Sequence, residues 1–77
     1  MPDPARPRRV LLVGATGFIG RRIRSVLEDS GHTVIAASRR PTAGGMRVDL
    51  ARDTDPAVWL PRVQGIDVVI NAAGAFN

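Results

Sequence analysis

The stretch VLLVGATGFIG at residues 10–20 decides the fold of this 77-residue chain, because an aliphatic run passes there into three glycines spaced three residues apart. A continuous apolar run that ends at a glycine is typical of a strand buried on both faces of a parallel sheet. From Phe18 onward the apolar residues recur at helical spacing, and charged residues occupy the other faces. The stretch therefore predicts a strand over 10–13, a tight turn, and an amphipathic helix of about three to four turns.

Two further strands are expected after this helix. Ser30-Gly31 marks the helix end, because glycine adopts the left-handed conformation that terminates a helix at little cost. The following residue, His32, is expected at the surface. The run 33–37 predicts a second strand, and 46–50 predicts a short third strand after a turn-rich segment.

The last third of the chain predicts an interrupted helix and a fourth strand. Asp55-Pro56 suits a helix start, with an N-cap side chain followed by proline at the first position. Pro61 removes a backbone donor, so we expect a broken or irregular helix over 56–64. The run 66–71 predicts another buried strand. This alternation favours an α/β fold with a parallel sheet, right-handed crossovers and the strand order 3-2-1-4.

The composition excludes several chemistries. The chain has no Cys and one His, so it offers no thiol nucleophile, no disulfide and no ligand set for structural zinc, and we expect no metal site. All 11 basic residues are Arg, and there is no Tyr, so neither a Schiff base nor a Tyr/Lys catalytic pair is available. No apolar run approaches the ~18 residues that span a bilayer. We expect a cytoplasmic chain without a catalytic residue of its own.

The positive charge is concentrated in the first half of the chain. Residues 1–40 carry eight Arg and three acidic residues, whereas 41–77 carry three Arg and four Asp. The first half is therefore expected to face an anion. Nucleic acid is not expected as a partner, because the arginines are dispersed without interleaved aromatic residues for stacking. Residues 1–8, which include three prolines, are expected to form a flexible lead-in to one domain over 9–77.

The glycine turn carries the main functional prediction. A diphosphate is held by backbone N–H groups at a helix N-terminus, where the helix dipole is positive and no Cβ obstructs its approach. Gly20 is expected to let the helix pack closely on the strand. The alternative is a βα turn without a ligand. The segment expected to hold the diphosphate consists of Gly14, Thr16, Gly17, Phe18 and Ile19.

The end of the second strand indicates which dinucleotide binds. An NAD site usually places Asp or Glu there to accept hydrogen bonds from the ribose hydroxyls. This chain has Ser38, Arg39 and Arg40 instead, and no acidic residue between Asp29 and Asp49. Guanidinium groups pair strongly with a 2′-phosphate, so NADP(H) is favoured over NAD(H). The alternative is that these arginines are solvated loop residues.

A second candidate contact follows the third strand. Asp49 is placed to accept a hydrogen bond from the adenine amino group, with Leu50 against the ring. The alternative is an Asp that only caps a turn.

Three motifs in register resemble one protein family. VGATGFIG at 13–20, Asp49-Leu50 and DVVINAAG at 67–74 are similar to motifs of the short-chain dehydrogenase/reductases. The resemblance is strongest to the extended and atypical members related to nucleoside-diphosphate-sugar epimerases, which have an NAD(P)-binding Rossmann fold. It implies that the residues after the fourth strand also contact the cofactor, namely Asn71, Ala72, Ala73 and Gly74.

The resemblance also implies what the 77 residues lack. Its catalytic Tyr-x-x-x-Lys and nearby Ser lie beyond the fourth strand, so the chain resembles the N-terminal part of a Rossmann domain, truncated after that strand. The remainder of the domain is then its structural partner, and the fourth strand forms a bare apolar edge that favours association. The function implied is binding of NADP(H) within an oxidoreductase or a sugar-nucleotide epimerase/dehydratase-like protein. The alternative is a non-catalytic NADPH-sensing or assembly protein.

Overall fold

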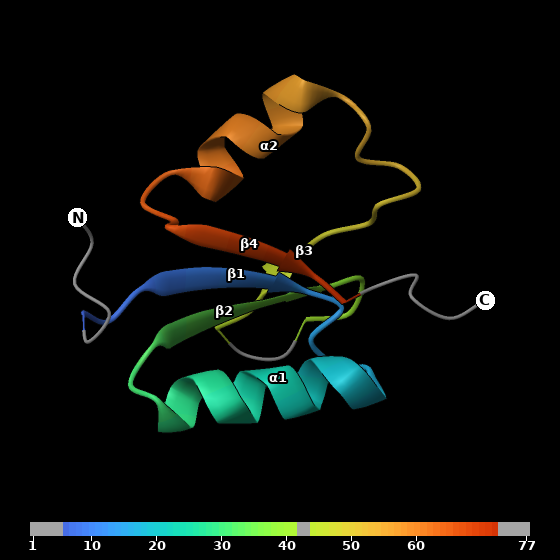
Figure 1. Ribbon diagram of the computed structural model, residues 1–77. Coiled ribbons are helices and arrows are strands. Elements are labelled where there is room, and N and C mark those ends of the chain that lie inside the picture. Colours follow the sequence, from blue (N-terminus) through green and yellow to red (C-terminus); the bar gives the residue numbers. More distant parts are fainter. Residues whose placement is uncertain (1–5, 42–43, 73–77) are drawn as a thin grey trace.

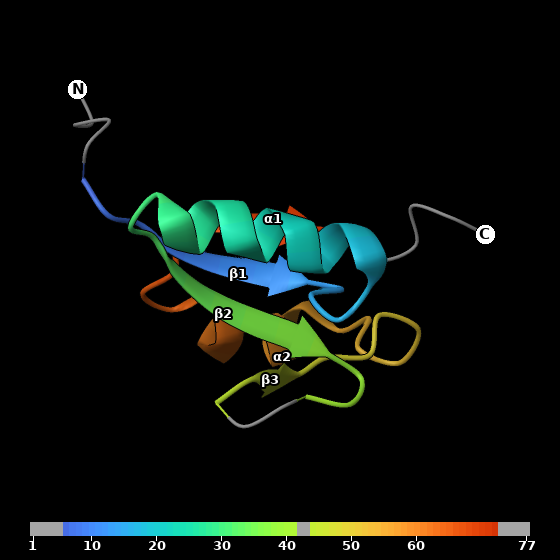
Figure 2. The ribbon, with the colours of Figure 1, turned by 90° about the horizontal axis from the view of Figure 1, so that it is seen from below.

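The computed structural model describes residues 6–41 and 44–72, which form a four-stranded sheet with one helix on each face (Figures 1 and 2). The expected contacts Ala73 and Gly74 lie outside the described residues, as do residues 1–5 of the expected lead-in. In chain order the elements are β1 (Arg9–Val13), α1 (Phe18–Asp29), β2 (Thr33–Ser38), β3 (Met46–Arg47), α2 (Pro56–Val63) and β4 (Val68–Asn71).

The sheet is parallel throughout and has the strand order β3-β2-β1-β4. Both the order and the α/β class predicted from the sequence are confirmed. β1 lies between β2 and β4, with Leu11 opposite Ile35 on one side and Val69 on the other. A strand enclosed on both edges and covered on both faces must be apolar at every position, which explains the uninterrupted aliphatic run.

The core lies in two layers because successive side chains of β1 point to opposite faces of the sheet. On the α2 face, Leu11 and Val13 belong to a cluster that is closed by Trp59 and Val63 of α2. On the α1 face, Leu12 and Ala36 pack with Ile23 of α1. Leu11 and Leu12 are fully buried, and each such leucine contributes about 2 kcal/mol of hydrophobic stabilisation.

β3 is shorter than the expected strand over 46–50. Its ladder ends after Val48, whose N–H donates to the Ser38 carbonyl at 2.9 Å. Beyond that point the backbone N–H groups donate to side chains instead of to β2. The Asp53 carboxylate accepts from the Asp49 N–H, and the Asp49 carboxylate accepts from the Ala51 N–H. These local hydrogen bonds compete with the strand, and the chain turns away from the sheet.

α2 runs without interruption from Pro56 to Val63, so the expected break at Pro61 is wrong. Proline removes only one hydrogen bond, the one to the Ala57 carbonyl, and Ala57 is exposed to solvent. As predicted, Asp55 caps the helix, accepting from the Ala57 N–H at 2.9 Å. β4 begins at Val68 instead of residue 66, because the Ile66 N–H is bonded to the end of α2 at the Val63 carbonyl.

At the amino end of the sheet, four hydrogen bonds link the start of β1 to the residues at the starts of β2 and β4. Arg8 donates its N–H to His32 Nδ1 at 3.1 Å, and its carbonyl accepts from the Thr33 N–H at 2.9 Å. Arg9 donates to Asp67 Oδ2 at 2.8 Å and accepts from the Asp67 N–H at 2.9 Å. His32 is half-buried in this arrangement and is not the simple surface residue that was expected.

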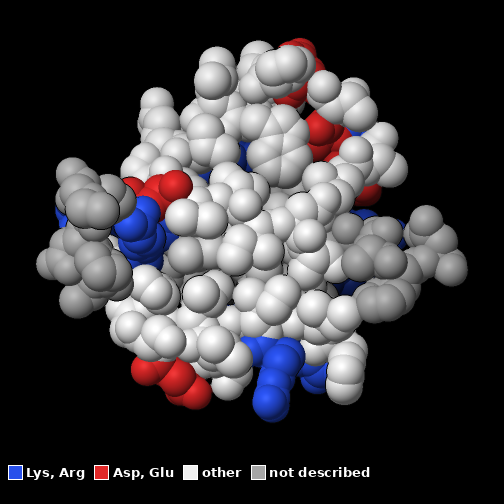
Figure 3. Space-filling view, in the orientation of Figure 1, with Lys and Arg blue, Asp and Glu red and all other residues white. Residues whose placement is uncertain are grey.

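β4 forms one edge of the described sheet, and the face around it is apolar. Val69 is 51% exposed and Leu60 of α2 is 66% exposed. Figure 3 shows that the centre of this face is uncharged, with Arg and acidic side chains at its periphery. The expected apolar edge is therefore present within the described residues, and its tendency to associate stays a prediction. No helix in this part of the chain is both long and apolar enough to cross a membrane.

Candidate functional site

The glycine turn lies at the carboxyl end of β1 and leads directly into α1, as the sequence predicted. Gly14 has φ +81°, a conformation that side chains other than glycine rarely adopt. Two amides of the turn are occupied by protein atoms: Gly14 N–H donates to the Ala37 carbonyl at 2.9 Å, and Gly17 N–H to the Gly14 carbonyl at 3.2 Å. These bonds fix the turn against β2, so an anion has to be held by other donors.

The start of α1 supplies such donors. The first N–H groups of a helix, here those of Phe18, Ile19 and Gly20, have no partner within the helix. Gly17 occupies the N-cap without a side-chain hydrogen bond, and the first turn contains no acidic residue. The positive end of the helix dipole is therefore not compensated locally. Phe18 is 86% exposed at this point, so nothing in the described chain covers the helix start.

The two glycines that flank the helix start are required for different reasons. A Cβ at Gly20 would overlap the Gly14 carbonyl oxygen and lie 2.9 Å from the Ala15 Cα, so this glycine is needed for packing. A Cβ at Gly17 would meet only the Gly14 oxygen, at 3.5 Å, and the backbone there (φ −72°, ψ 170°) suits any residue. The fold itself does not need glycine at position 17.

Residues from four separate segments line one open hollow of about 650 Å³ at the carboxyl ends of the strands. The segments are the glycine turn, the end of β2, the loop after β3 and the residue after β4. Each of these segments was expected at the cofactor site, the last of them from the family resemblance, and the fold brings them together. The lining comprises Val13, Gly14, Thr16, Gly17, Ser38, Arg39, Val48, Asp49, Leu50, Ala51 and Ala72.

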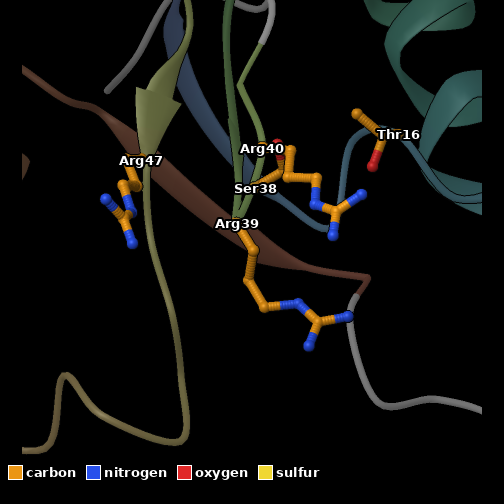
Figure 4. A pocket seen from close by; sticks show the side chains of 5 residues that line it. All are labelled: Thr16, Ser38, Arg39, Arg40 and Arg47. Carbon is orange, nitrogen blue, oxygen red and sulfur yellow. The ribbon is translucent and has the colours of Figure 1, made fainter.

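A second hollow of about 600 Å³ adjoins the first and is basic (Figure 4). Arg40 extends from the end of β2 toward Thr16, and Arg47 projects from the neighbouring strand β3. Thr16, Ser38 and Arg39 line both hollows. Three guanidinium groups and two hydroxyls thus line this hollow, and guanidinium groups and hydroxyls are donors that pair with anions.

Arg47 is a site residue that the sequence reasoning missed. Parallel pairing places it beside Ser38, and residues paired in this way project to the same face of the sheet. Within residues 6–41 and 44–72 the ion pairs are Arg24–Glu28 and Arg62–Asp53, so Arg47 has no acidic partner there. The register of strand pairing could have identified Arg47, because a third strand whose residues pair with the end of β2 places Arg47 beside Ser38.

The remaining predicted residues are distributed around these hollows. Phe18, Ile19, Gly20 and Ala72 line a smaller apolar hollow of about 370 Å³ together with Gly17. Leu50 is 42% exposed and available to a flat ligand. Asp49 Oδ1 accepts from the Ala51 N–H at 3.0 Å, so Asp49 does cap a turn, as the alternative reading held. Asn71 lies at the end of β4, opposite Val13.

A charged cluster lies behind the loop that carries Asp49. The Asp49 N–H and the Arg62 guanidinium both donate to the Asp53 carboxylate, each at 2.9 Å, and these bonds hold the pKa of Asp53 below its ordinary value. The carboxylate is therefore ionised throughout the neutral range. No group of three His, Cys, Asp or Glu side chains in the described part of the chain is placed to hold a metal ion.

Comparisons with known proteins agree with this geometry. The sequence profile described as the NAD dependent epimerase/dehydratase family matches residues 10–77. A phenylcoumaran benzylic ether reductase of Pinus taeda is 30% identical over 90% of this chain and 27% of its own length. An epimerase family protein of Mus musculus is 39% identical over 86% of this chain and 20% of its own length.

Among solved structures, the nucleoside-diphosphate sugar epimerase of Corynebacterium glutamicum superposes with a TM-score of 0.74 at 34% identity. The match covers 95% of this chain and 15% of that one. The chain therefore spans about a quarter or less of the length of these relatives. With its parallel 3-2-1-4 sheet and its glycine turn at the start of α1, the chain belongs to the NAD dependent epimerase/dehydratase family, whose members bind nicotinamide dinucleotides.

Proposed function

We propose that this chain binds the adenosine diphosphate part of NADP(H). One observation carries the proposal: the glycine turn, the end of β2 and the loop after β3 line a single hollow beside an uncapped helix start. Ligands of open α/β sheets bind outside the carboxyl ends of the strands, where this hollow lies. The absence of a Cβ at Gly17, which the fold does not require, supports the approach of a diphosphate to the backbone.

Each part of the ligand has a matching set of groups. The diphosphate is held by the amides at the start of α1, those of Phe18 and Ile19, where the Gly17 backbone leaves room for its approach. Adenine lies against Leu50 and donates its amino group to Asp49, whose Oδ1 accepts the turn bond. The 2′-phosphate occupies the basic hollow, held by Ser38 and Arg39, with Arg40 and Arg47 completing its positive lining.

The activity of the whole protein follows from its relatives, and we propose an oxidoreductase or a sugar-nucleotide epimerase/dehydratase-like enzyme. The 77 residues contribute the adenosine side of the cofactor site. They contain no Tyr and no Lys, so a catalytic Tyr-x-x-x-Lys of the kind that the family resemblance implies would have to come from residues other than these 77.

The test compares NADPH with NADH by fluorescence titration of the chain, with folding verified by circular dichroism. We expect NADPH to bind at least tenfold more tightly, because charge-assisted hydrogen bonds to a phosphate contribute about 1.5–3 kcal/mol. Arg39→Ala should remove most of this preference and leave NADH binding unchanged. Arg9→Ala is the matched control, since it removes the same charge at the amino end of the sheet.

Two results would contradict the proposal at different levels. Equal affinity of the native chain for NADH and NADPH would overturn the preference for NADP(H). Failure of the folded chain to bind either dinucleotide, or 5′-ADP, would overturn the binding function itself.

A further inference from the structure

The loop after β3 is held in shape by reciprocal hydrogen bonds between Asp49 and Asp53. The Asp49 N–H donates to Asp53 Oδ2 at 2.9 Å, and the Asp53 N–H donates to the Asp49 carbonyl at 2.8 Å. Within this ring, the Ala51 N–H donates to Asp49 Oδ1 at 3.0 Å, which fixes the orientation of the Asp49 carboxylate. Three bonds thus define the geometry of a segment that the sheet no longer supports.

The same Asp53 fastens the loop to α2. Arg62 Nη1 lies 2.9 Å from Asp53 Oδ2, and both side chains are only about one-fifth exposed (19% and 22%). Trp59 Nε1 donates to the Asp53 carbonyl at 2.7 Å, and the Arg62 guanidinium stacks on the Trp59 ring, 4.9 Å from its centroid. Trp59 packs against the core cluster of Leu11 and Val13, so the loop is attached to a rigid part of the molecule.

Asp53 itself does not line the hollow of about 650 Å³ at the carboxyl ends of the strands, which we call the adenosine hollow. Asp49, Leu50 and Ala51 line that hollow, whereas Asp53 lines a separate one of about 420 Å³ with Arg47, Asp49, Arg52 and Arg62. Asp49 is the residue that faces both spaces. An effect of Asp53 on the adenine base is therefore transmitted through Asp49.

We infer that Asp53 is a positioning residue for adenine recognition: its carboxylate, anchored by Arg62, fixes the Asp49 carboxylate in the orientation that accepts the adenine amino group. This inference rests on the proposed function, because it assumes that adenine binds at Asp49-Leu50. It adds that the anchor to α2 determines how well the site distinguishes adenine from other purines.

The experiment uses a pair of nucleotides that differ at the group Asp49 would contact. Inosine 5′-diphosphate carries an acceptor oxygen in place of the adenine amino group, so the donor that Asp49 would contact is lost, and the N–H that remains on that edge of the base lies one ring position away, at N1. Loss of one hydrogen bond to a charged group costs about 1.5–3 kcal/mol, so the native chain should bind 5′-ADP about tenfold more tightly than inosine 5′-diphosphate. Calorimetric titration of both ligands measures the ratio.

Asp53→Asn keeps the size of the side chain but removes the charge pair with Arg62. We expect the preference for 5′-ADP to fall to about threefold or less, through weaker 5′-ADP binding alone. Arg62→Gln, which leaves Asp53 in place without its anchor, should reduce the preference in the same direction. Far-ultraviolet circular dichroism verifies that each variant is folded, because Trp59 contacts both Asp53 and Arg62 and its emission would report the substitutions themselves.

Asp55→Ala is the matched control for a merely structural effect. It removes the cap of α2 and so lowers the stability of the chain, but Asp55 accepts from Ala57 rather than from Asp49. Its preference for 5′-ADP should equal that of the native chain. Retention of the native preference in folded Asp53→Asn and Arg62→Gln would overturn the inference and leave the proposed function intact. A native chain that binds neither nucleotide would overturn the proposed function, and the inference with it.

Discussion

The two ends of the sheet are built from the same strands but satisfy their polar groups in opposite ways. At the amino end, Arg8 and Arg9 exchange hydrogen bonds with His32, Thr33 and Asp67. At the carboxyl end, the helix start has no side-chain cap and Arg47 has no acidic partner in the described chain. At the amino end these bonds stabilise the fold, whereas the ligand of the proposed function would meet the groups left unbonded at the carboxyl end.

Gly20→Ala should have the largest effect, because it alters the packing on which the carboxyl end is built. The new Cβ would overlap the Gly14 carbonyl oxygen, a backbone atom that cannot move independently. Overpacking of this kind costs about 3 kcal/mol, and we expect a corresponding loss in thermal or urea unfolding. Ser25→Ala on the exposed side of α1 is the control, with a change below about 0.5 kcal/mol. A stable Gly20→Ala variant would contradict the assignment of Gly20 to packing.

Gly17→Ala should separate binding from stability at the same end. The added Cβ has only an ordinary contact with the Gly14 oxygen. The free energy of unfolding should therefore fall by about 1 kcal/mol or less, the usual effect of changing an N-cap residue. The Cβ would occupy the approach to the backbone, and affinity for NADPH should fall by more than about tenfold. Titration of NADPH fluorescence measures this. Unchanged affinity would place the diphosphate elsewhere.

Asp67→Ala tests the amino end. It leaves the Arg9 N–H without its side-chain acceptor, and a hydrogen bond of this kind contributes about 1 kcal/mol. We expect that loss in denaturant unfolding and no change in dinucleotide affinity. A loss of affinity in the folded variant would show that the two ends are not independent.

Arg47→Ala should have the smallest effect and would refine the boundary of the site. Arg47 lines the basic hollow from β3 and is exposed, so its charge is partly screened by solvent. We expect the preference for NADPH over NADH to fall by about threefold, with stability changed by less than about 0.5 kcal/mol. An unchanged ratio would restrict phosphate recognition to the residues at the end of β2.

The glycine turn was predictable because its signals are local: an aliphatic run, three spaced glycines and a helical period all lie within residues 10–29. The strand order was predicted from the alternation of strands and helices along the chain, which favours a parallel α/β sheet. The length of β3 was not predictable in this way, since it depends on Asp53 competing for the Asp49 amide. The predicted break at Pro61 was wrong because the energetic cost of the lost helical hydrogen bond depends on the solvent exposure of the Ala57 carbonyl group, which the sequence does not show. The position of Arg47 at the site was not predicted, because it depends on the pairing of Arg47 with Ser38 in the neighbouring strand, and no local sequence pattern connects these two residues.

The two adjoining hollows share three lining residues, Thr16, Ser38 and Arg39. This shared lining bears on the affinity for a ligand that would occupy both hollows at once. If the proposed function holds, a nucleotide in the larger hollow would order side chains that a phosphate in the basic hollow would also contact. When ribose and phosphate are covalently joined, the second contact forms at an effective concentration that is in the millimolar range for short flexible links. Adenosine and inorganic phosphate supplied as separate molecules should therefore fail to reproduce the affinity of the joined compound, so the covalent link itself contributes to discrimination.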